Sequence, residues 1–279
     1  MNIRLVVFDL DGTALTSEKT ISPRTWAAFD AAIRAGISIV PATGRQLNFL
    51  PKGLPEHPGI AYIIANNGAT VFSPVEKKIL LHRPFSEEGA SAVLAECRTC
   101  RALVFGSNAD RSVLDKRGAA WDDREILALY HRHESLWRPR LGNLEEAFFT
   151  GGRENGPGQE LCKFALVFTD AAEQARSLEK LRARADVYVT SSDRNNLELV
   201  IPGVGKETAL RFVAERLGLA MDQVMSIGDN LNDLGMIREA GFGVAMGNAL
   251  PEVKAEAGFI TASCDEDGVA LAIEKALGS

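Results

Sequence analysis

The sequence is poor in the residues that stabilise small secreted domains or bind soft metals. Its 279 residues include four cysteines and four histidines, which is too few for a disulfide framework in a chain of this length. Cys97 and Cys100 form its only C-x-x-C pair, in a predicted helix, where free cysteines are usually small buried hydrophobes. The composition therefore argues against a disulfide-stabilised fold and against a thiolate metal centre.

The sequence also lacks long apolar runs and an excess of positive charge. No run approaches the roughly 18 apolar residues that a membrane span requires. The first four residues carry one basic side chain and lead into a strand that ends in acids, so we expect no signal peptide and a cytoplasmic protein. The net charge of −6 argues against a nucleic-acid partner but permits a small anionic substrate. The sequence indicates no oligomeric state.

The order of the predicted elements indicates an α/β fold. Apolar strands are predicted over 3–8 and 37–40, and between them a helix begins at Ser22-Pro23 and ends at Gly36. Strand, helix and strand at this spacing form a βαβ unit, which requires parallel pairing. The sequence therefore predicts a doubly wound parallel sheet.

The middle of the chain alternates differently from its two ends. After 1–83 the βαβ rhythm stops, and it resumes over 197–279. The block 84–196 between them ends in closely spaced strands that read as antiparallel, and we also expect a helix over 123–131 and a glycine-rich loop over 151–158 within it. We therefore predict a parallel-sheet core in two parts, with 84–196 inserted as a second α/β domain.

Two carboxylates follow the first predicted strand. Asp9 and Asp11 are two residues apart and are followed by Gly12 and Thr13. Alternate residues of a strand share a face, so both acids can point into the same space, where they would repel unless a cation or a shared proton intervened. An Asp-Gly after a strand is more often an ordinary turn, so the interpretation depends on the later motifs.

Polar side chains also follow the other predicted strands. Open α/β sheets build their sites at the carboxyl ends of strands. Taken alone, each side chain has a structural explanation, as a turn cap, a solvated lysine or an acid at a helix start. Together they supply hard oxygen ligands without a His or Cys cluster, which favours Mg²⁺. These residues are Thr43, Lys206, Asp229, Asn232, Asp233 and Asn248.

Taken together, the strand-end residues resemble the four motifs of the haloacid dehalogenase superfamily, in order and spacing. The motifs are Asp9-x-Asp11-Gly12-Thr13, Thr43, Lys206 and Gly228-Asp229-x-x-Asn232-Asp233. Four further phrases resemble the Cof-type, class IIB branch of sugar-phosphatase-like hydrolases: Ala42-Thr43-Gly44-Arg45, Asn67-Gly68-Ala69, Met246-Gly247-Asn248-Ala249 and Asp265-Glu266-Asp267-Gly268-Val269. The resemblance implies a Rossmann-like core of this superfamily with a C2B-type cap over 84–196.

The resemblance also implies a reaction, the Mg²⁺-dependent hydrolysis of a small phosphorylated metabolite. In the Cof-type, class IIB branch this substrate would be a sugar phosphate. Asp9 would attack phosphorus and form an aspartyl-phosphate, and Asp11 would protonate the leaving oxygen and then deprotonate water. Asp9, the main-chain carbonyl of Asp11, and Asp229 would hold the metal. Asp233 would not bind the metal directly but would hold Lys206 or a metal-bound water.

The phosphate-binding groups implied by the resemblance come from three loops. Thr43 and the backbone N–H groups near it, at Gly44 and Arg45, would bind phosphoryl oxygens, and Lys206 would neutralise their charge. Asn232 would also touch the phosphate, while the Arg45 side chain alone is more simply explained as structural. In the inserted domain the candidates for substrate specificity are Ser191, Ser192, Asn195, Asn196 and Glu198.

Two alternatives to a phosphatase stay open at this point. A phosphomutase or phosphotransferase on the same core would pass the phosphoryl group to a second hydroxyl, and Asp11 would serve that chemistry equally well. A phosphoacceptor regulatory module also groups acids with a hydroxyl and a lysine. It would have no use for the proton relay of Asp11 or for the inserted domain, which favours an enzyme.

Overall fold

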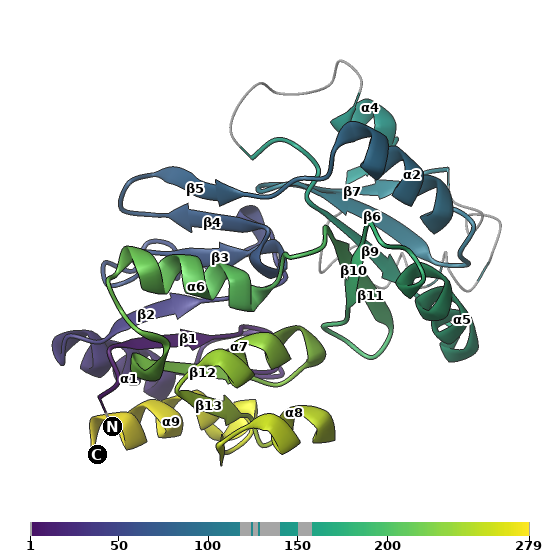
Figure 1. Ribbon diagram of the computed structural model, residues 1–279. Coiled ribbons are helices and arrows are strands. Elements are labelled where there is room, and N and C mark those ends of the chain that lie inside the picture. The colour runs from purple at the N-terminus through teal and green to yellow at the C-terminus, as the bar shows by residue number, and fades with distance from the viewer. Residues whose placement is uncertain (1, 118–123, 125–127, 129–139, 150–157, 279) are drawn as a thin grey trace. The chain divides into compact units, whose positions relative to one another are not determined.

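A computed structural model describes residues 2–117, 124, 128, 140–149 and 158–278 (Figure 1). The chain divides into two compact units, each formed by more than one segment. The first consists of Met1–Gly44, Leu50–Leu80 and Gly205–Ser279, and the second of Arg45–Phe49 and Leu81–Val204. No helix within the described ranges is long and apolar enough to cross a bilayer.

The predicted inserted block, 84–196, lies inside the second unit, which also takes in the short segment 45–49. The helix predicted over 123–131, apart from residues 124 and 128, lies outside the described residues, as does the glycine loop predicted over 151–158, apart from Gly158.

The first unit is built on a five-stranded parallel sheet in the order β14-β13-β12-β1-β2. β1 lies between β12 and β2 and is buried along its whole length, which explains its uninterrupted apolar sequence. This sheet confirms the predicted doubly wound α/β core. Its strands are β1 (Leu5–Phe8), β2 (Ser38–Pro41), β12 (Val224–Gly228), β13 (Phe242–Ala245) and β14 (Phe259–Ile260).

Among the helices of the first unit, α1 packs against α9, and α7 packs against both α6 and α8. The start of α1 is confirmed, because Pro23 opens the helix and the Ser22 hydroxyl accepts a hydrogen bond from the Thr25 N–H. Phe29 of this helix stacks on Phe8 of β1, with ring centroids 4.7 Å apart. The helices are α1 (Pro23–Arg34), α6 (Lys206–Arg216), α7 (Leu234–Glu239), α8 (Pro251–Glu256) and α9 (Gly268–Leu277).

A three-stranded sheet in the order β3-β4-β5 joins the carboxyl end of β2. Its last two strands form a hairpin, β4 (Thr70–Ser73) and β5 (Lys78–His82). A parallel bridge between Ala42 and Ile64 connects β3 (Ile63–Ala65) to the residues after β2. The short 3₁₀ turn η2 (Asn66–Gly68), which links β3 to β4, therefore lies beside the loop that follows β2.

The second unit is a six-stranded sheet in the order β10-β11-β9-β6-β7-β8, with helices α2, α4 and α5. Its pairings are antiparallel, as expected for its last strands, except for the parallel pair β7-β8. The elements are α2 (Glu87–Cys97), β6 (Leu103–Ser107), β7 (Ser112–Asp115), β8 (Arg140–Gly142), α4 (Leu144–Phe148), β9 (Lys163–Val167), α5 (Ala171–Arg182), β10 (Tyr188–Thr190) and β11 (Asn196–Val200).

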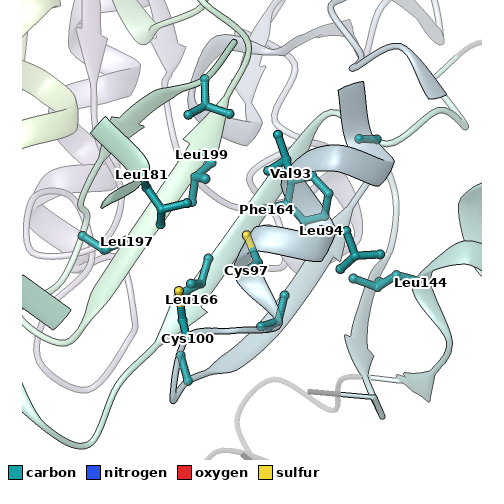
Figure 2. Close-up of a cluster of buried hydrophobic side chains, with 14 of the residues drawn as sticks. Val93, Leu94, Cys97, Cys100, Leu144, Phe164, Leu166, Leu181, Leu197 and Leu199 are labelled. Atoms are coloured by element: carbon teal, nitrogen blue, oxygen red, sulfur yellow. The ribbon is translucent and has the colours of Figure 1, made fainter. Parts of the chain in front are cut away.

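Both cysteines of the C-x-x-C pair belong to the hydrophobic core of the second unit, which Figure 2 shows between the helices and the sheet. α2 ends at Cys97, so Cys100 lies beyond the helix that was predicted to hold both. Burial raises the pKa of the Cys97 thiol well above its ordinary value, and that of Cys100 to a lesser degree. Two neutral thiols packed against Leu166 and Leu181 act as small hydrophobic side chains.

Candidate functional site

The candidate site begins where two neighbouring strands of the parallel sheet end. β1 and β12 pair in register, with Phe8 opposite Ile227, and the Asp9 N–H extends the ladder to the Ile227 carbonyl at 3.0 Å. Asp9 follows the first strand and Asp229 the second. Parallel pairing therefore brings two carboxylates from distant parts of the sequence to the same sheet edge.

Lys206, the first residue of α6, is the buried centre of this acid group. Its ammonium donates to Asp9 Oδ1 at 2.5 Å and to Asp233 Oδ1 at 2.6 Å, and its side chain is fully buried. Burial alone would lower the Lys206 pKa, but the charges of Asp233 and Asp9 more than offset this and raise the pKa above its ordinary value. The lysine therefore remains a cation between two acids.

Asp233 supports the other acids through both of its carboxylate oxygens. Oδ1 accepts from Lys206, while Oδ2 accepts from the backbone N–H groups of Asp229 and Asn230 at 2.9 and 3.0 Å. A Cβ on Gly228 would lie 2.4 Å from the Cβ of Asp233, so this approach requires glycine there. Asp233 thus fixes both the lysine and the start of the loop that carries Asp229.

Asp229 is fixed from the opposite side by the loop after β1. The Thr13 hydroxyl donates to Asp229 Oδ1 at 2.9 Å. Gly12 has a φ of +79°, and a Cβ on it would lie 2.5 Å from Asp229 Oδ2. Asn248 donates its amide N–H to the Gly12 carbonyl at 2.8 Å. The glycine of the Asp-x-Asp-Gly motif is therefore needed for a left-handed turn in contact with the second carboxylate.

The residues of this group fit a hard divalent cation. Asp9, Asp229 and Asp233 each offer an oxygen, and these oxygens lie within 4.8 Å of one another. Burial is the main cause that raises the pKa of Asp9, and burial with the Asp233 charge raises that of Asp229 to about 7. Such an excess of buried negative charge favours a bound cation, and an all-oxygen ligand set suits Mg²⁺. Because Asp233 already uses both oxygens, Asp9 and Asp229 are the better ligands.

The Asp11 carboxylate is not one of the three whose oxygens lie within 4.8 Å of one another, although its charge contributes to the raised pKa of Asp229. The Asp11 carboxylate is about one-third exposed and pairs with the Lys19 ammonium at 2.9 Å. The expected shared direction of Asp9 and Asp11 relies on strand alternation, but β1 ends at Phe8, and Asp11 lies in the turn that follows and forms a bridge with Leu15. Sequence reasoning missed Lys19, and no motif in the sequence indicates this lysine.

Thr43 and Asn232 are brought together through one residue, Asn67. Thr43 is buried, and its carbonyl accepts from the Asn67 N–H at 3.0 Å. The Asn232 amide donates to Asn67 Oδ1 at 3.1 Å. Gly44 is the last residue of its segment of the first unit, whereas Arg45 belongs to the second unit, where its guanidinium donates to the Phe49 carbonyl at 2.9 Å.

The specificity candidates of the second unit contribute to its own structure. Asn196 Oδ1 accepts hydrogen bonds from the Ser191 hydroxyl and the Ser192 N–H, both at 3.1 Å. Asn195 accepts through its carbonyl from the Phe168 N–H. Glu198 forms a buried ion pair with Lys163, at 2.6 Å. These contacts stabilise the turn between β10 and β11 and the β9-β11 pair.

The raised pKa of Asp229 predicts how pH changes the stability of the metal-free protein. The folded state keeps its proton up to about pH 7, whereas the unfolded state loses it near the ordinary value of 3.8. The folded state thus binds more protons between these values, so the free energy of unfolding should fall as pH rises from about 5 to about 7. Because Mg²⁺ competes with the proton, it should restore stability at pH 7 and have little effect at pH 5.

Thermal melts in EDTA and in MgCl₂ across this pH range would measure the effect. Asp229→Asn is the matched control, because it lacks this carboxyl while it keeps Asp9, whose pKa is also raised, and it should show a flatter pH dependence in EDTA. A wild-type melting temperature that rises steadily from pH 5 to pH 7 in EDTA, and is unchanged by Mg²⁺, would contradict this account of the acid group.

Comparison with known proteins gives consistent matches over nearly the whole chain. The family described as haloacid dehalogenase-like hydrolase matches residues 6–273. The 5-amino-6-(5-phospho-D-ribitylamino)uracil phosphatase YcsE of Bacillus subtilis is 32% identical over 278 residues, which cover 98% of this chain and 95% of that protein.

Solved structures show the same likeness. A haloacid dehalogenase-like hydrolase from Bacteroides thetaiotaomicron aligns with a TM-score of 0.76 at 29% identity, covering 98% of this chain and 99% of that one. A sugar phosphatase of subclass IIB of the same superfamily has the same fold, with a TM-score of 0.79 at 24% identity over 99% of both chains.

Proposed function

Because this chain belongs to the haloacid dehalogenase-like hydrolase family, we propose that it uses Asp9 and Mg²⁺ to hydrolyse a sugar phosphate or sugar-alcohol phosphate. This membership confirms the superfamily that the motifs resemble, and the class IIB neighbour shares the fold. The chain is accordingly a phosphoric monoester hydrolase that acts on small phosphorylated metabolites. The metal, the covalent intermediate and the substrate class are the parts that we propose.

One observation carries the proposal, the buried Lys206 between Asp9 and Asp233 with Asp229 beside them. A lysine at a helix start is normally solvated, whereas this one is buried with two carboxylates. Moving three charges out of water has a large desolvation cost, which close pairing must offset. Lys206 holds one oxygen of Asp9 and leaves the second for attack. Its positive charge also lies where charge builds up on a phosphoryl group that Asp9 attacks.

We propose that hydrolysis proceeds in two steps through Asp9. In the first step a carboxylate oxygen of Asp9 bonds to phosphorus, the bond from phosphorus to the ester oxygen breaks, and Asp11 gives that oxygen its proton. In the second step Asp11 takes a proton from water, the water oxygen bonds to phosphorus, and the bond from phosphorus to Asp9 breaks. Phosphate leaves, and both carboxylates return to their initial state.

Asp9 and Asp229 would hold Mg²⁺, together with the Asp11 carbonyl. When bound, the metal supplies charge neutralisation for the phosphoryl oxygens and for the Asp9 carboxylate. Asp233 and Thr13 would keep Asp229 in place, and Lys206 would do the same for Asp9. Thr43 would bind phosphoryl oxygens from the neighbouring loop.

The proposed substrate class combines the branch of the family with the relatives' names. YcsE is named for a substrate whose phosphate sits on a ribityl chain, and the subclass IIB neighbour is named a sugar phosphatase. Both carry the phosphate ester on a flexible chain or ring rich in hydroxyl groups. We therefore place the substrate of this chain among phosphorylated sugars and sugar alcohols.

A phosphate-release screen tests the proposed function. We expect release from p-nitrophenyl phosphate and higher kcat/KM for a subset of sugar and sugar-alcohol phosphates, including the ribityl substrate. EDTA should abolish turnover, and Mg²⁺ should restore it. An isomerised sugar phosphate with no free phosphate would instead identify a phosphomutase. Full activity in EDTA would contradict the metal assignment.

A further inference from the structure

The turn η2 has an unusual backbone. Asn66, Asn67 and Gly68 have φ values of +51°, +55° and +91°, so three successive residues are left-handed. Non-glycine residues seldom adopt this conformation. Two consecutive left-handed asparagines persist only when contacts with the surrounding structure hold the backbone in place. Both asparagines are buried, with 0% and 2% exposure. Asparagine and glycine are the residues that tolerate these angles best.

The turn contacts three loops that carry residues of the candidate site. The Asn67 N–H donates to the Thr43 carbonyl at 3.0 Å, and Asn67 Oδ1 accepts from the Asn232 amide at 3.1 Å. A Cβ on Gly68 would lie 2.0 Å from the Gly205 carbonyl oxygen and 3.0 Å from the Lys206 nitrogen. One turn therefore touches the loop after β2, the loop after β12 and the start of α6.

The Asn232 side chain shows why this contact matters. It is nine-tenths buried, and its amide oxygen has no hydrogen-bond partner within the described ranges. A buried amide with an unsatisfied atom is costly, and such atoms mark places where a ligand or water completes the site. Asn67 Oδ1 takes one N–H of the Asn232 amide, which leaves the second N–H to donate to an acceptor such as a phosphate oxygen, while the amide oxygen is left for a donor such as a water.

We propose that Asn67 is a positioning residue for phosphate binding, which orients the Asn232 amide with its side chain and the Thr43 loop with its backbone. This inference rests on the proposed function, because Asn232 and Thr43 are phosphate-binding residues only in that account. Asparagine combines tolerance of a left-handed conformation with a short, neutral acceptor for Asn232. Glycine keeps the backbone but loses the acceptor, and aspartate keeps the acceptor but adds negative charge beside an anion.

The glycine variants N67G and N66G separate positioning from general damage to the turn. Both replace a buried left-handed asparagine by the residue that best tolerates that conformation. Only N67G removes the acceptor for Asn232, because the Asn66 amide faces Thr70 instead, at 3.5 Å. The probe is inorganic phosphate as an inhibitor of p-nitrophenyl phosphate hydrolysis by the full chain in MgCl₂, with thermal melts recorded in parallel.

We expect N67G to raise the inhibition constant for phosphate about tenfold, the upper range for one lost hydrogen bond. N66G should leave that constant within about twofold of the wild-type value, whatever its melting temperature. The double variant N67G/N232A should bind phosphate no more weakly than N232A alone, because Asn67 acts through Asn232.

Three results would overturn the inference. They are an unchanged inhibition constant in N67G, an equal rise in N66G, or fully multiplicative losses in the double variant. A wild-type protein that hydrolyses no phosphate ester would instead refute the proposed function itself. Active wild-type protein with N67G indistinguishable from it would refute this inference alone.

Discussion

Replacing Asp9 by asparagine is expected to reduce phosphate-ester hydrolysis by at least about 10⁴-fold, since the loss of a nucleophile removes the covalent route. An amide oxygen carries no full negative charge and does not attack phosphorus at a useful rate. Asp9 also accepts a hydrogen bond from Lys206 and is itself a proposed metal ligand. The measurement is the steady-state rate with p-nitrophenyl phosphate in MgCl₂, with the fold checked by circular dichroism.

The matched control for this variant is Asp30→Asn. Asp30 lies on α1 with about half of its side chain exposed, so its loss should leave the rate within about twofold of wild type, as for most surface substitutions. Mass spectrometry must exclude deamidation of the new asparagine back to aspartate. A residual rate above one-hundredth of the wild-type rate in deamidation-free protein would show that Asp9 is not the nucleophile.

Replacing Lys206 by methionine is expected to destabilise the metal-free protein by about 3–5 kcal/mol at neutral pH, since it leaves buried charges without their partner. Asp9 and Asp233 would then face each other without the cation that both now contact. The loss should shrink at lower pH, where the carboxylates take up protons. Urea unfolding in EDTA at pH 7.5 and at pH 5.5 measures both quantities.

Two further variants test whether the loss of stability in Lys206→Met comes from the unpaired buried carboxylates. Lys206→Met combined with Asp233→Asn removes one of the stranded charges, so it should recover part of the lost stability. Lys78→Met breaks an exposed pair with Glu76 and should change the free energy of unfolding by less than about 1 kcal/mol. If Lys206→Met is as stable as wild type at pH 7.5 in EDTA, the buried ion group does not hold the fold in the manner described.

Local rules were sufficient to predict much of the first unit. The apolar run before Asp9 predicts a buried parallel strand, and the Ser22-Pro23 pair predicts the start of α1. Both patterns depend only on a few neighbouring residues in the sequence. The parallel sheet then follows from strand–helix–strand spacing, and it brings Asp229 beside Asp9 without any knowledge of tertiary contacts.

The contacts that sequence reasoning missed join residues far apart in the chain or depend on a turn's conformation. The Lys19 ammonium reaches Asp11 because the loop after β1 folds back, which no periodicity indicates. The left-handed run that places Asn67 between Thr43 and Asn232 is fixed by tertiary contacts rather than by local preference.

The second unit was less predictable than the first for a related reason. β7, β8 and α4 have only three to five residues each, and β8 pairs with β7 across a long separation in sequence, with Val113 opposite Arg140. β8 also pairs in parallel with β7 inside an otherwise antiparallel sheet. Short strands with non-local partners carry weak signals of their own.

Acid-quenched mass spectrometry of the protein during turnover is the most direct test of the central claim that Asp9 carries the phosphoryl group. Asp11→Asn is the variant of choice, because it lacks the group that activates water and should accumulate the intermediate. The account predicts one added phosphoryl group, on the peptide that contains Asp9 and absent from Asp9→Asn. Phosphate release in the wild type with no phosphorylated peptide in either protein, or with the group on another residue, would contradict it.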